Sequence, residues 1–216
     1  MKPDEWPTLP SLAPPGPGGQ HLHEVLAGRL LAQRVVLLNG PLDDLTVTRV
    51  AAELMTLDAD GDDAVTLRVD CGEAALAPAL TLMDVIELMG VPVRALCLGQ
   101  VAGGAVGVVA VCAQRSAMPS TRFLLCEPAT RFEAHVRNVA QWAELRAGER
   151  RRFCERLGAA VGRAPEAIEA DLDRGRFLAA PEALAYGILD EVCRPDAAIR
   201  QLPGSGPAPM GFRPVH

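Results

Sequence analysis

Short runs of β-branched and aliphatic residues alternate along this chain with segments of helical length, and this alternation restricts the possible folds more than any other feature. The strand-like runs cover residues 35–38, 65–69, 93–98 and 123–126. Apolar residues recur at helical spacing in segments 44–57, 75–89 and 104–114. Strand-helix-strand repeats of this length give parallel strands joined by right-handed crossovers. We therefore expect an α/β fold.

In α/β folds the functional groups gather where a strand ends and the next helix begins. Loops 70–74 and 99–104 are therefore the expected place of a site. The fold should occupy residues 21–196, because segments 1–20 and 197–216 are rich in Pro and Gly and lack an apolar period. We expect both of these terminal segments to be flexible.

A long amphipathic helix is predicted over residues 133–160, with an apolar stripe on one side and arginines on the rest. At 1.5 Å per residue it would reach about 40 Å, more than the width of a compact domain of this size. Such a helix should project and need a partner, unless it breaks near Gly148. Shorter helices are expected at 165–172 and from Pro181.

Charge and composition exclude several classes of partner. The formal net charge is −6, whereas a nucleic-acid-binding protein needs a basic surplus. No run of 18 apolar residues is present and the first twenty residues do not resemble a secretory signal, so we expect a cytoplasmic protein that binds no membrane. The cysteines are scattered, so we expect reduced core residues, with no metal and no cofactor. They are Cys71, Cys97, Cys112, Cys126, Cys154 and Cys193.

Several motifs together resemble the proteolytic subunit of the Clp protease, the ClpP family. The matching stretches are 29–40, 97–100, 118–128, 173–183, 186–187 and 189–190. The resemblance covers about residues 28–193 and implies a ClpP/crotonase-like fold. Through the projecting helix it also implies a homo-oligomeric ring, either a heptamer or two heptamers stacked into a tetradecamer that encloses a chamber.

This resemblance implies a Ser-His-Asp triad, but none of its three residue types stands at the matching position. The family's G-Q-A-A-S-M-G motif reads Gly99 to Ala105 here, so Gly103 replaces the nucleophilic serine. Cys126 replaces the general-base histidine, and Gly175 replaces the aspartate that orients it. A catalytically inactive site is therefore our leading interpretation.

The oxyanion region implied by the resemblance departs from the family pattern as well. Glu73 takes the place of a glycine whose amide would bind the oxyanion, and a carboxylate there repels negative charge. Gly104 would supply the second amide. Cys126 could act as a nucleophile only with a lowered pKa, which the neighbouring carboxylates Glu73 and Glu127 oppose.

Two enzymatic alternatives stay open. A remodelled pocket could use Glu73, Glu127 or Cys126 for non-proteolytic chemistry, since carboxylates in clefts act as general acids or bases. Asp173 could also move toward the vacated aspartate position. A peptidase with a relocated pair, Ser120 and His135, is the third interpretation.

Partner binding is also in question. The resemblance implies that an AAA+ unfoldase docks on a strand here written 65–69, but its two tyrosine positions carry Thr66 and Arg68. An arginine does not rebuild an apolar pocket, so unfoldase docking is doubtful. We expect a structural or regulatory subunit of a homo-oligomer, or of a mixed ring with active subunits.

Overall fold

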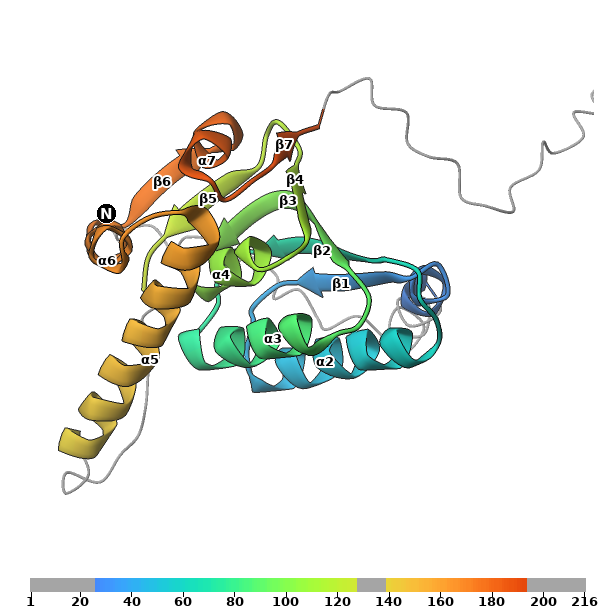
Figure 1. Cartoon of the computed structure of the whole chain (residues 1–216), viewed down its shortest axis with the longest axis horizontal. Coiled ribbons are helices and arrows are strands. Elements are labelled where there is room, and N and C mark those ends of the chain that lie inside the picture. Colours follow the sequence, from blue (N-terminus) through green and yellow to red (C-terminus); the bar gives the residue numbers. More distant parts are fainter. Residues whose placement is uncertain (1–25, 128–138, 194–216) are drawn as a thin grey trace, which may run out of the picture.

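The computed structural model describes residues 26–127 and 139–193. Both terminal segments named above, and the first residues of the predicted long helix, lie outside this part of the chain. Figure 1 shows the described part as a twisted sheet with helices packed against it and one helix extending from the body.

A largely parallel sheet forms the centre of the molecule. Its main path runs β1-β2-β3-β4-β7, and every neighbouring pair on that path is parallel. The strands are β1 (Val35–Asn39), β2 (Val65–Cys71), β3 (Val93–Ala102), β4 (Gln114–Ala117) and β7 (Glu191–Val192). Strand β5 (Arg122–Leu125) continues parallel to the end of β3, and β6 (Arg176–Ala179) pairs with it antiparallel. The α/β prediction is confirmed.

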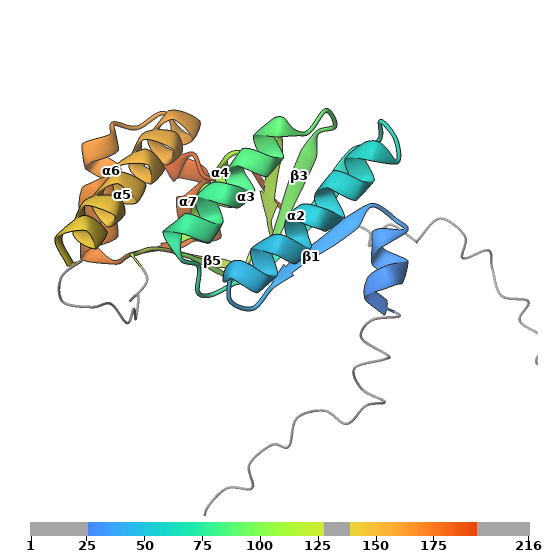
Figure 2. The ribbon, with the colours of Figure 1, turned by 90° about the horizontal axis from the view of Figure 1, so that it is seen from below.

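Side-chain alternation explains how the sheet is covered. In β2 the odd-numbered residues Val65, Leu67 and Val69 are fully buried, while Thr66 and Arg68 between them are half-buried. Helices α2 (Asp44–Ala59) and α3 (Leu76–Leu88) lie side by side over one face of the sheet (Figure 2). Burial of these alternating apolar side chains against the two helices supplies the main driving force for folding.

The predicted helix at 104–114 is shorter in the structure. Helix α4 (Gly104–Ala110) has all of its residues buried, and the chain then turns into β4, which pairs with β3. The four predicted strands are all present. The short strands β4, β6 and β7 were not predicted, because they are as short as β5 or shorter and lack its run of three consecutive large apolar residues.

The projecting helix is α5 (Val139–Val161), which spans about 35 Å at 1.5 Å per residue (Figure 1). It runs through Gly148 without interruption, so the alternative of a broken helix is wrong. Phe153 and Leu157 are fully buried and anchor its second half on the body. Helices α6 (Pro165–Arg174) and α7 (Ala180–Tyr186) follow. Within the described ranges, no helix is both long and apolar enough to cross a bilayer.

Candidate functional site

The candidate site begins where β3 bulges against β2. The β2–β3 register shifts between Val69 and Cys71, so that β3 contains two residues more than β2 there and bulges at Gly99 and Gln100. The carboxylate of Asp70 packs against this bulge, and its Oδ1 accepts a hydrogen bond from the Gln100 amide at 3.0 Å. A Cβ atom on Gly99, whose φ is +54°, would lie 2.5 Å from the same oxygen. This role of Asp70 was not predicted from the sequence, although an Asp near the end of a strand is a common turn signal.

Gly103 sits at the sharp turn from β3 into α4. Its backbone has φ 58° and ψ −132°, a conformation that strains any residue with a side chain. Its amide donates to the Leu124 carbonyl at 3.0 Å, which ties this turn to β5. A strand-to-helix turn of this kind presents the nucleophile in α/β hydrolases. Here it carries no side-chain atom.

Cys126 follows β5 and lies beside this turn. Burial raises the pKa of its thiol, and a hydrogen bond from the Gly103 backbone opposes that rise. The structure therefore brings together two of the positions singled out in the sequence. The expected cause of the high thiol pKa, repulsion by carboxylates, is not the main one.

Gly175 ends helix α6 in a left-handed conformation, with φ 64° and ψ 63°. Its amide donates to the Leu172 carbonyl at 3.2 Å, the pattern of a glycine C-cap. A Cβ atom on Gly175 would meet nothing within 4 Å. Local geometry thus favours glycine, while the space around it would admit a larger residue.

The amide of Gly104, the second expected oxyanion donor, already has an acceptor inside the protein. It donates to the Ala74 carbonyl at 3.0 Å. A Cβ atom on Gly104 would lie 2.5 Å from the Ala79 Cβ and 2.8 Å from the Ala75 carbonyl oxygen. Helices α3 and α4 therefore touch at this glycine, and the amide is engaged in joining them.

Glu73 lies in the loop before α3 and is exposed. Its backbone is fixed, since its carbonyl accepts the Leu42 amide at 2.8 Å and the Cys71 thiol at 3.2 Å. Gly72 beside it faces the Gln100 side chain. Loops 70–74 and 99–104 thus meet, as the parallel-sheet argument predicted.

Glu127 and Asp173 are held by one arginine of α5. The Arg150 guanidinium donates to the Glu127 carboxylate at 2.9 Å and to the Asp173 carboxylate at 2.6 Å. Its Nε also lies 3.2 Å from a carboxylate oxygen of Glu169. The hydrogen bond to Asp173 is the main reason that the pKa of Arg150 is raised. Both carboxylates are therefore engaged by the same guanidinium, which the sequence alone did not indicate.

The relocated pair Ser120 and His135 is described only in part. Ser120 is exposed in the turn that precedes β5, and His135 lies outside the described residues. On β2, the Arg68 Nε is buried and lacks a hydrogen-bond partner within the described ranges. The residues that the structure describes contain no cluster of His, Cys, Asp and Glu that could hold a metal ion.

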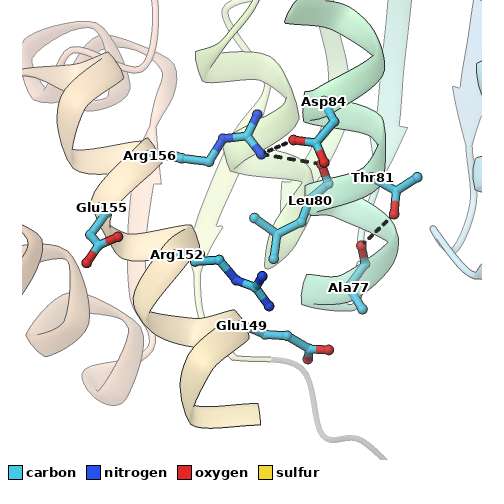
Figure 3. A pocket seen from close by; sticks show the side chains of 8 residues that line it. All are labelled: Ala77, Leu80, Thr81, Asp84, Glu149, Arg152, Glu155 and Arg156. Carbon is cyan, nitrogen blue, oxygen red and sulfur yellow. Dashed lines mark hydrogen bonds and ion pairs between the residues drawn. The ribbon is translucent and has the colours of Figure 1, made fainter. Parts of the chain in front are cut away.

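A groove of about 300 Å³ lies between α3 and α5, away from these residues (Figure 3). Arg156 crosses it from α5 and pairs with Asp84 and, at 3.0 Å, with Glu87 of α3. The groove shares no lining residue with the turn at Gly103. We interpret it as part of the attachment of α5 to the body.

Fold and site together define a protein built like a serine peptidase of the α/β type. The family model of the Clp protease matches residues 18–196, and the chain belongs to that family. One relative, an ATP-dependent Clp protease proteolytic subunit 1 from Nocardia farcinica, is 30% identical over 198 residues, covering 87% of this chain and 97% of that protein. Another, a proteolytic subunit 2 from Thermobifida fusca, is 32% identical over 178 residues, covering 80% and 87%.

Proposed function

We propose that this protein is a catalytically inactive member of the Clp protease family, with a structural or regulatory role in a ring-shaped oligomer. The observation that carries the proposal is the turn at Gly103. Its backbone has the conformation that would present a nucleophile, yet it offers no atom that could attack a carbonyl carbon.

The surroundings of Gly103 support the same conclusion. Cys126 stands where the family resemblance implies the base, and its pKa is raised by burial rather than lowered. The Gly104 amide is engaged by the Ala74 carbonyl, so an oxyanion would have to compete with an existing hydrogen bond. The positions of the nucleophile, the base and one oxyanion donor are then all altered around the same turn.

A role in an oligomer is supported by the projecting helix α5. Its first half extends beyond the body and exposes Leu145, which is 46% accessible. An apolar side chain in that position favours contact with another subunit. The relatives are themselves described as subunits, which favours either a homo-oligomer or a mixed ring with an active subunit.

The test has two arms that use the full-length protein. A fluorophosphonate probe and a fluorogenic peptide should give no labelling and no cleavage, while an active Clp proteolytic subunit in the same buffer gives both. Labelling of any serine, including Ser120, would overturn the proposal. Native mass spectrometry should show an oligomer, and co-expression with the active subunit tests for mixed rings.

A further inference from the structure

We propose that Arg150 joins the end of β5 to the end of α6, and so replaces the histidine-aspartate link that the family resemblance places between the same two elements. In the motif, that link would run from position 126 to position 175. Here these positions carry Cys126 and Gly175, which cannot form it. The inference therefore rests on the proposed loss of the triad.

The arginine link uses residues directly beside the lost ones. Glu127 follows Cys126, and Asp173 lies two residues before Gly175. Arg150 reaches both across 23 residues of sequence in each direction, at 2.9 Å and 2.6 Å. One planar guanidinium with several donors suits such a bridge, because it can serve two carboxylates at once.

The position of Arg150 makes this link effective. It projects from the middle of α5, one turn before the buried Phe153 and Cys154, so its backbone is anchored. Its side chain is 22% exposed, whereas those of Glu127 and Asp173 are 38% and 61% exposed. Salt therefore screens the pairs in part, and raising the ionic strength should weaken the link.

Three elements meet at this one side chain. Glu127 lies two residues after the end of β5, Glu169 and Asp173 belong to α6, and Arg150 belongs to α5. The link thus connects α5, α6 and the residues after β5 without any catalytic side chain. It gives the end of β5 and the end of α6 a connection that needs neither a histidine at position 126 nor an aspartate at position 175.

Hydrogen exchange of the full-length protein tests the proposal. Arg150→Met keeps the aliphatic stem, and it should speed exchange of the amides of residues 122–127 and 169–175 about tenfold. Arg151→Met, on the exposed side of the same helix, should leave these amides unchanged. About 1 M NaCl should move the wild-type protein toward the Arg150→Met pattern, because the Debye length falls to about 3 Å. Unchanged exchange in Arg150→Met would overturn the proposal.

A milder variant keeps the proposal testable if Arg150→Met fails to fold. Glu127→Gln removes one carboxylate from a partly exposed position, so it should loosen residues 122–127 and leave α6 protected through Asp173. Equal effects on both elements would contradict a bridge. The readout is backbone exchange, so it is independent of whether the protein cleaves peptides.

Restoring the family's pair in the weakened background completes the test. Gly175 has room for a side chain, and Asp is among the residues that accept a left-handed backbone. Adding Cys126→His and Gly175→Asp to Arg150→Met should return slow exchange at both elements. A folded triple variant that stays unprotected would contradict the idea that the two links are interchangeable.

Discussion

The amide of Gly104 donates a hydrogen bond to the carbonyl of Ala74 at 3.0 Å, which joins the first turn of α4 to the loop that begins α3. The glycine allows this approach because any Cβ atom would press on the Ala75 carbonyl oxygen and the Ala79 side chain. The same bond engages the amide that the family resemblance assigns to oxyanion binding. The close approach of α3 and α4 and the engagement of the Gly104 amide therefore have one cause, the contact between Gly104 and the residues around Ala74.

Gly104→Ala should destabilise the fold by about 1–3 kcal/mol, because the added methyl group has no space between α3 and α4. Urea unfolding followed by circular dichroism measures the change. Gly148→Ala in α5 is the matched control: a Cβ there meets nothing within 4 Å, so the variant should gain about 0.5–1 kcal/mol. Equal stability of the two variants would contradict the close approach at Gly104.

Gly103→Ser alone should not create a reactive serine. Cys126, which lies beside the turn, has a raised thiol pKa and does not replace a base, and the Gly104 amide would still be bound to Ala74. We expect fluorophosphonate labelling at the level of the unmodified protein. Labelling above that level would mean that another group near the turn activates the hydroxyl, and it would favour the enzymatic alternatives.

Cys126 should react slowly with iodoacetamide at neutral pH, because burial raises the pKa of its thiol and little thiolate is present. The rate should climb as the pH is raised above the usual thiol pKa. Peptide mass spectrometry separates Cys126 from the fully buried Cys97, which should stay unlabelled until the protein unfolds. Alkylation of Cys126 faster than of free cysteine at pH 7 would support an activated nucleophile instead.

Tyr186 makes stability depend on pH in the alkaline range. Its hydroxyl donates to the buried Asp171 carboxylate at 2.8 Å, and burial together with that carboxylate raises the pKa of Tyr186 to about 12. The folded protein therefore holds the phenol proton more tightly than the unfolded chain does. This contribution is complete below the ordinary tyrosine pKa of about 10 and is lost as the pH rises toward about 12.

Because the chain has a single tyrosine, tyrosinate absorbance reports this group alone. Its titration midpoint should lie well above that of the urea-unfolded protein. Tyr186→Phe should abolish the tyrosinate signal and lower stability at pH 7 by about 1–3 kcal/mol, since Asp171 loses a donor. A wild-type titration that coincides with the unfolded one would refute the buried contact.

Much of the fold could be predicted from local pattern. The alternating and β-branched residues of the run Val65 to Val69 predict strand β2. The apolar spacing of 44–57 predicts helix α2. Strands β4, β6 and β7 could not be found in the same way. They pair because β3 presents an open edge to β4, β4 to β7 and β5 to β6, and that is a property of the assembled sheet.

The candidate site divides in the same manner. Residue identity alone settles that positions 103 and 175 carry no functional side chain, because glycine has none. The partners of Glu127, Asp173 and the Gly104 amide depended on atoms far away in the chain, such as the Arg150 guanidinium and the Ala74 carbonyl. The sequence by itself determined the strand-helix alternation and the presence of glycine at positions 103 and 175. Only the tertiary structure decided which remaining groups are engaged, because hydrogen bonds and ion pairs depend on distances that spacing along the chain does not set.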